Sequence, residues 1–224
     1  MATYKLNIAT VRGCPPPEDV AAALEAFGLP EDDEFGVLEH SATAQGAFGT
    51  VVRKVQQSVQ RLDAEARAVT AAAIEKVQVY PFGIYPRSGV LEVYAGSATS
   101  IEQIGAFLSG GLGLPTLVEA LEIDLASALE KLADQTERFQ LRSVRVAEYA
   151  HNSYMSGPYA PKFLDSEHGR EFLEEYGEFV TAAAARFKTP NGRATVRLSP
   201  KACFGYSCPE DDRQVVRSIL RKLL

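Results

Sequence analysis

The sequence predicts a mixed α/β fold of the α+β type, in which helices pack on a largely antiparallel sheet. Three observations support this class. Units of a strand followed by a helix recur from Tyr4, Val90 and Arg193, and β-rich runs follow one another through short turns that contain Gly and Pro. Hydrophobic residues are 46% and charged residues 23% of the 224 residues, which is typical of a chain that fills a core.

The first 50 residues predict two strands around one helix. β-forming residues alternate imperfectly over 4–11, and a run of prolines breaks that strand. Pro17 suits the first turn of a helix over 18–27, which Gly28 then ends. A short strand is expected over 35–44.

The next segment favours a helix. Its apolar residues are three or four positions apart, which places them on one side of a helix. They are Val51, Val52, Val55, Val59 and Leu62. Residues 63–76 are rich in Ala, the strongest helix former, so helix is expected there too. Whether 51–76 forms one helix or two elements is left open.

A β-hairpin is expected over 76–96, with its turn at 86–89. Ser97 or Thr99 then caps a helix over 100–109. The later elements are a strand over 116–123, a helix over 125–138, a strand over 142–150, a loop over 151–163, a helix over 165–187, a strand over 193–201 and a helix from Pro209 to the end.

Charge is unevenly distributed along the chain. Residues 1–139 hold 10 Lys and Arg against 19 Asp and Glu, whereas residues 140–224 hold 13 against 10. The net charge of −6 argues against a protein covered by nucleic acid, and the acidic stretch 18–39 is either a solvated face or a surface for a basic partner.

The chain is expected to form one globular domain over 1–224, or two tightly packed subdomains over about 1–125 and 126–224. No apolar run is long enough for a membrane helix, and three cysteines do not suggest a disulfide framework, so a cytoplasmic protein without membrane association is expected.

Clustered Lys and Arg are the candidates for phosphate contact, because such clusters release counterions from a nucleic-acid backbone even when the whole protein is acidic. Ordinary surface charge is the alternative interpretation. The candidates come from the segment 51–62, the strand 193–201 and the last helix: Arg53, Lys54, Arg61, Arg193, Arg197, Lys201, Arg213, Arg217 and Arg221.

Two other groups of residues suggest different functions. Tyr149, Tyr154 and Tyr159 stand among small polar residues, a composition that suits a partner-binding surface, although the tyrosines could equally pack on the protein itself. A hydrolase or metal enzyme would use His151, His168 or the pair Cys203 and Cys208, but no second local ligand pair accompanies these cysteines. We therefore expect no cofactor, no metal and no catalytic residue.

One stretch resembles a known family. SGVLEVYAGSATSIEQIGAFL begins at Ser88 and is followed by a Gly-Leu-Pro exit at Gly113. A strand that ends in a small-residue turn, a helix and such an exit resemble part of the RdgC family of recombination-associated proteins, over about residues 76–121. The resemblance implies a non-enzymatic protein that binds duplex DNA without sequence preference as a ring-shaped homodimer with a basic inner surface.

The leading hypothesis is therefore a nonspecific nucleic-acid-binding protein that acts by occupying duplex DNA. The alternative is a protein-interaction module, acting as a homo-oligomer or as a regulatory subunit of a larger complex, which would use the acidic first third and the tyrosines.

Overall fold

The computed structural model divides the chain into two compact units. The hairpin unit is Thr10–Glu119, and the C-terminal unit joins Met1–Ala9 to Ala120–Leu224. Strand β1 (Ala2–Arg12) gives its first residues to the C-terminal unit and its last to the hairpin unit. The structure describes residues 2–30, 33–63, 68–96, 98–152, 155–163 and 166–224.

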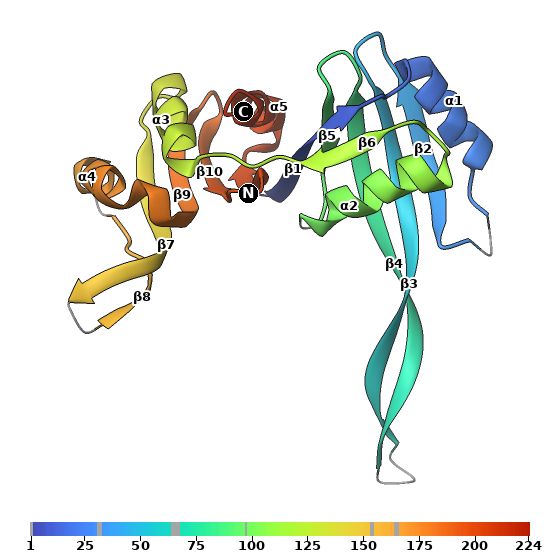
Figure 1. Cartoon of the computed structure of the whole chain (residues 1–224), viewed down its shortest axis with the longest axis horizontal. Helices are drawn as coiled ribbons and strands as arrows, with labels where there is room; N and C mark the ends of the chain where they lie inside the picture. The colour runs from blue at the N-terminus through green and yellow to red at the C-terminus, as the bar shows by residue number, and fades with distance from the viewer. Residues whose placement is uncertain (1, 31–32, 64–67, 97, 153–154, 164–165) are drawn as a thin grey trace. The chain divides into compact units, whose positions relative to one another are not determined.

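Eleven strands and five α-helices make up the described chain, and every strand pair with a defined register is antiparallel. The predicted α+β class with a large antiparallel sheet is confirmed (Figure 1). No helix in the described ranges is long and apolar enough to cross a membrane.

The hairpin unit is a sheet with two helices on one face (Figure 1). Its strands follow the order β2-β3-β4-β5-β1, and β6 also pairs with β1. The elements are α1 (Pro17–Phe27), β2 (Phe35–Ala42), β3 (Ala47–Asp63), β4 (Ala68–Tyr85), β5 (Val90–Val93), α2 (Thr99–Ala106), the π-helical turn η1 (Phe107–Gly111) and β6 (Leu117–Ala120).

Helix α1 begins and ends as its sequence predicts. Pro17 opens the helix, and Gly28 closes it with a φ of 63°, a conformation that glycine adopts without strain. The buried Val20 and Leu24 point from α1 toward the sheet. The ring of Phe27 meets that of Phe107 edge to face, with 5.1 Å between centroids, so α1 and η1 close one core.

The helix predicted over 51–76 is wrong. Residues 47–63 and 68–85 are instead the paired strands β3 and β4, in a continuous register from Ala47 with Ile84 to Asp63 with Ala68. β-branched valines fit a pleated strand as well as a helix, and pairing with a distant strand overrode the helix preference of alanine. Because 64–67 lie outside the described residues, the turn of this hairpin is not described.

The C-terminal unit is a sheet in the order β1-β11-β10-β9-β7-β8, with helices on one face (Figure 1). Its elements are α3 (Leu125–Gln135), β7 (Gln140–Asn152), β8 (Met155–Tyr159), α4 (Ser166–Tyr176), the 3-10 turn η2 (Gly177–Phe179), β9 (Val180–Thr189), β10 (Gly192–Leu198), β11 (Cys203–Cys208), the 3-10 turn η3 (Glu210–Asp212) and α5 (Arg213–Arg221).

The helix predicted over 165–187 is correct only as far as Tyr176. Residues 180–189 form β9, where Ala183, Ala185 and Phe187 are buried and the residues between them are less so. This period of two is typical of a strand. Small alanines on the covered face leave room for α3, which packs on β9 through Leu129 and Leu132. A high alanine content therefore misled the prediction a second time.

Smaller corrections concern caps, loops and ends. Thr99 begins α2 rather than capping it, because the N-cap is Ala98 without a side-chain hydrogen bond, and Ser97 lies outside the described residues. The loop predicted over 151–163 contains β8. The last α-helix begins at Arg213 after the 3-10 turn η3.

Candidate nucleic-acid interface

The C-terminal unit has one covered and one uncovered sheet face. On β10 the covered residues Ala194, Val196 and Leu198 are at most 2% exposed, as the alternation predicted. Helices α3 and α5 pack on this side through the buried Leu129, Leu132, Val216 and Leu220. We call the opposite side, which carries Arg193, Thr195 and Arg197, the open face.

The open face has no acidic residue on four neighbouring strands. β1, β11, β10 and β9 contain neither Asp nor Glu. Their outward side chains are basic, hydroxyl-bearing or small. The positive charges of this face are therefore not neutralised by acids on the same strands.

Strand register arranges these residues in rows across the sheet. In one row Lys5 and Arg197 each lie opposite Gly205, and Arg197 also lies opposite Ala184. The row continues through Ser143 to Lys162. Strands lie about 4.8 Å apart, so the five steps from Lys5 to Lys162 span about 24 Å.

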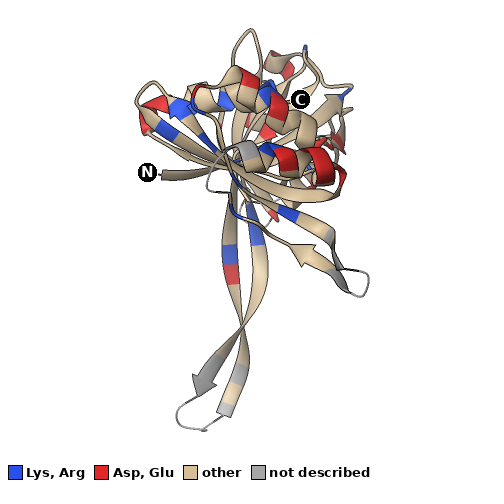
Figure 2. Ribbon diagram, turned by 90° about the vertical axis from the view of Figure 1, so that its left-hand side faces the viewer, with Lys and Arg blue, Asp and Glu red and all other residues tan. Residues whose placement is uncertain are grey.

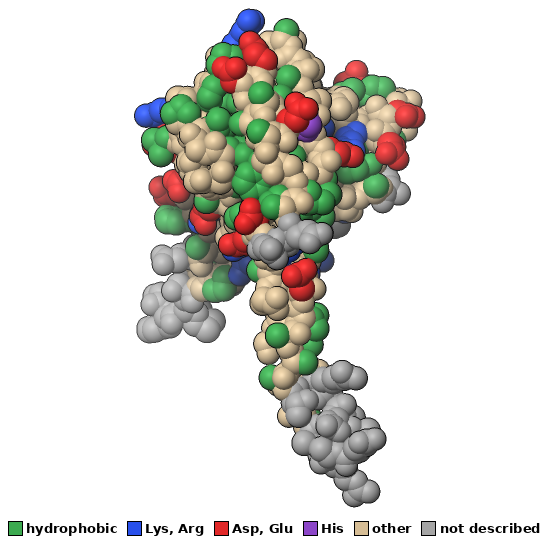
Figure 3. All heavy atoms as spheres, turned by 90° about the vertical axis from the view of Figure 1, so that its right-hand side faces the viewer, with side chains coloured by type: hydrophobic (Ala, Val, Ile, Leu, Met, Phe, Trp, Pro, Cys, Tyr) green, Lys and Arg blue, Asp and Glu red, His purple; other side chains and the backbone are tan. Residues whose placement is uncertain are grey.

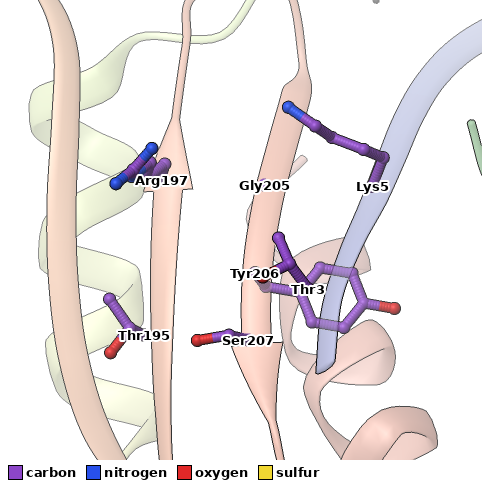
Figure 4. Close-up of a pocket in the computed structure, with 7 residues that line it drawn as sticks. All are labelled: Thr3, Lys5, Thr195, Arg197, Gly205, Tyr206 and Ser207. Carbon is purple, nitrogen blue, oxygen red and sulfur yellow. The ribbon is translucent and has the colours of Figure 1, made fainter. Parts of the chain in front are cut away.

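Three shallow hollows lie along the open face, with volumes of about 170, 280 and 290 Å³. No Asp or Glu is among the residues that line them. Eight basic residues line the three hollows: Lys5, Arg138, Arg145, Lys162, Arg186, Lys188, Arg193 and Arg197. Figure 4 shows the first hollow, with Lys5 and Arg197 on either side of Gly205.

Like charges also face each other directly. Arg193 lies opposite Lys188 in the β9–β10 register, an arrangement that destabilises a strand pair. The Lys188 Nζ lies 3.0 Å from the Glu137 carboxylate, an exposed ion pair that contributes little. An external anion would relieve this repulsion.

Of the three basic residues predicted on the strand 193–201, two lie on the open face and the third does not. Arg193 and Arg197 are outward and exposed on β10, as expected. Lys201 is also exposed, but β10 ends at Leu198, so Lys201 belongs to the following turn and not to the strand face.

The arginines of the last helix lie on the covered side of the sheet. The Arg213 guanidinium lies 4.6 Å from the centroid of the Tyr4 ring, and Tyr4 in turn packs against the buried Tyr206. Arg217 is 7% exposed and Arg221 is exposed on the same helix. Since α5 packs on the face opposite Arg197, these arginines do not extend the open face.

The basic residues predicted over 51–62 are not brought together. Arg53 and Lys54 are consecutive in β3, so they point to opposite faces, and Arg61 is eight residues or about 26 Å along the strand. Arg53 pairs with Glu34 and lies over the Phe35 ring. The Arg61 side chain lies outside the described residues.

Sequence reasoning missed six basic residues of the open face: Lys5, Arg138, Arg145, Lys162, Arg186 and Lys188. They are far apart in the sequence, and two of them, Arg138 and Arg186, lie in segments predicted as helix, 125–138 and 165–187. The absence of acid from β1 and from 180–208 was a usable signal.

Two of the tyrosines predicted to bind a partner, Tyr149 on β7 and Tyr159 on β8, form part of an aromatic cluster with α4. The rings of Tyr149 and Tyr159 stack at 4.6 Å between centroids, and Tyr149 lies 4.9 Å from Tyr176. A hydrogen bond with Glu175 and burial raise the pKa of Tyr176 to about 12. These tyrosines thus pack largely on the protein itself, and Tyr154 lies outside the described residues.

The cysteines do not share a site. Cys203 and Cys208 are an odd number of residues apart in β11, so they lie on opposite faces, and burial raises the pKa of both thiols. His168 is exposed on α4, and the side chain of His151 is not described. In the described part of the chain, no three His, Cys, Asp or Glu side chains form a group that could hold a metal ion.

No known protein-family model matches this chain, and no curated protein matches it.

Proposed function

We propose that the protein binds duplex nucleic acid without sequence preference, through the open face of its C-terminal unit. The observation that carries this proposal is a row about 24 Å long in which the basic residues Lys5, Arg197 and Lys162 alternate with Gly205, Ala184 and Ser143, and whose first four strands contain no acid. Duplex DNA carries about one negative charge per 1.7 Å of its axis, so such a face reaches many phosphates at once.

The chemistry of the face favours contacts to the backbone over contacts to bases. Single-strand binders stack bases on aromatic side chains. The outward residues of β9, β10 and β11 include Arg, Lys, Thr, Ser, Ala and Gly, and none is aromatic. Arg and Lys neutralise phosphates regardless of sequence. Duplex occupancy without chemistry agrees with the expectation from the RdgC resemblance, but it rests on this face alone.

The test measures binding of the full chain to two unrelated labelled duplexes by fluorescence anisotropy, at salt concentrations from 50 to 200 mM. Similar affinity for both sequences and a steep negative slope of log affinity against log salt are expected. Absence of binding at 50 mM salt would refute the proposal.

A second candidate function is association of two copies of the chain through the β3–β4 hairpin. Beyond Lys54 and Val77 the two strands pair only with each other among the described residues. Most of this ribbon carries no charge (Figure 2), and apolar side chains are exposed along it (Figure 3). Val69, Ile74 and Val77 are 45 to 63% exposed. Uncovered two-stranded ribbons with apolar side chains are typical sites of association.

The measurement for this second function is the mass of the protein in solution by light scattering. If the hairpin joins copies of the chain, the mass exceeds 24.3 kDa and Ile74→Gln with Val77→Gln reduces it to the monomer value. A mass unaffected by this change would exclude the hairpin from the contact.

A further inference from the structure

The hollow around Gly205 is lined by side chains from three neighbouring strands, β1, β11 and β10. Gly205 on β11 lies between Lys5 on β1 and Arg197 on β10 in the strand register. A Cβ atom built on Gly205 would lie 3.7 Å from the Lys5 Nζ and 3.9 Å from the Arg197 Cβ. The ammonium group thus extends over the backbone of a residue that has no side chain (Figure 4).

Hydroxyl groups border the same hollow. Thr3 and Thr195 each lie opposite Ser207 in the next row of the sheet, and all three residues line the hollow of about 170 Å³. The remaining lining residue, Tyr206, is 1% exposed, so its ring belongs to the covered side. The hollow therefore offers an ammonium, a guanidinium and up to three hydroxyl donors, with no carboxylate among its lining residues.

We propose that this hollow is a seat for a single phosphate group of a nucleic-acid backbone, held between Lys5 and Arg197. A tetrahedral oxyanion accepts hydrogen bonds from ammonium, guanidinium and hydroxyl groups, and these charge-assisted bonds are the stronger kind. The absent side chain at Gly205 lets the oxyanion approach the sheet between the two cations. This assignment rests on the proposed function and adds to it one fixed position for the backbone.

Gly205→Val tests the seat without changing any charge. Its Cβ meets its neighbours at ordinary contact distances, and a β-branched residue suits a strand, so the variant keeps the fold while filling the hollow. The matched control is Gly157→Val on strand β8, where a Cβ meets nothing within 4 Å. Thermal unfolding checks both variants, and Gly205→Ala replaces the valine variant if the latter does not fold.

The expected result is a loss of at least about tenfold in duplex affinity for Gly205→Val, the size of one charge-assisted hydrogen bond, with no loss for the control. Lys5→Ala should then reduce duplex affinity less in the Gly205→Val background than in the wild type, because both changes remove the same contact. If the wild type binds duplex and Gly205→Val binds equally well, the seat is refuted while diffuse binding by the open face stands.

Inorganic phosphate distinguishes a seat for the backbone from a site for a small phosphate. In the wild type, titration with inorganic phosphate is followed through the NMR signal of the Gly205 amide, and duplex should compete with it. A phosphate-dependent shift that duplex leaves unchanged would overturn the assignment to the backbone. If the wild type does not bind duplex at all, the proposed function is refuted instead.

Discussion

Removal of three open-face arginines should weaken duplex binding and flatten its salt dependence by a calculable amount. Arg186, Arg193 and Arg197 lie on adjacent strands of the face. Each phosphate contact contributes about 0.9 to the slope of log affinity against log salt, so Arg186→Ala with Arg193→Ala and Arg197→Ala removes about 2.7.

The absolute values follow from the eight basic residues that line the hollows. If all eight contact phosphates, the slope of the wild type is about −7 and affinity falls about 10⁴-fold between 50 and 200 mM salt. For the triple variant the slope is about −4.5 and the fall is about 500-fold.

The assay is fluorescence anisotropy of a labelled duplex at four or five salt concentrations. A matched control changes the same amount of charge on the covered side, through Arg170→Ala, Arg221→Ala and Lys222→Ala on or beside α4 and α5. An equal loss of slope in both triple variants would show that net charge, and not the open face, governs binding, and would refute the reasoning.

Two further predictions concern the stability of the C-terminal unit. Phe187 is 1% exposed in β9, so Phe187→Ala should lower the free energy of unfolding by about 3–5 kcal/mol in urea titrations, and a change below about 1 kcal/mol would contradict the packing of β9. Burial alone would raise the pKa of Asp212, but hydrogen bonds donated by the backbone and side-chain amides of Asn191 hold it below its ordinary value. Because the folded pKa is the lower one, the ionised carboxylate stabilises the fold above the ordinary pKa of Asp, and this stabilisation is lost as the pH falls through the folded value. Asp212→Asn should therefore be less stable than the wild type at neutral pH, with a difference that shrinks in acid; a difference independent of pH would contradict it.

Sequence reasoning recovered the elements whose signals are local. Pro17 and Gly28 bound α1, and the turn over 86–89 joins β4 to β5, because caps and turns depend on a few neighbouring residues. The alternation of Arg193 to Leu198 gave the two faces of β10 correctly. These features determine where the open face lies in the sequence.

Both large errors involve alanine in strands. Residues 71–73 and 182–185 are alanine-rich and were predicted as helix, yet they pair with Gln60, Val59 and Ser58 in one case and with β7 and β10 in the other. Helix propensity is a difference of less than about 1 kcal/mol per residue, and long-range pairing exceeds it. Local sequence does not predict a strand whose pairing partner is distant in the sequence.

Only two of the eight basic residues that line the hollows of the open face were predicted from the sequence. Arg193 and Arg197 were found because they are close in one strand, whereas Lys5 and Arg186 reach the same face only through the order β1-β11-β10-β9. By composition alone the arginines of α5 are equivalent to Arg193 and Arg197, but α5 packs on the covered side of the sheet.

The central claim is that duplex covers the open face, and amine labelling of lysines tests it most directly. Lys5, Lys162 and Lys188 are exposed on the open face, whereas Lys131 and Lys222 are exposed on the covered side. With saturating duplex at low salt, mass spectrometry should find labelling of the first three reduced and that of the other two unchanged. Reduced labelling of Lys131 and Lys222 with none at Lys5, Lys162 and Lys188 would contradict the account.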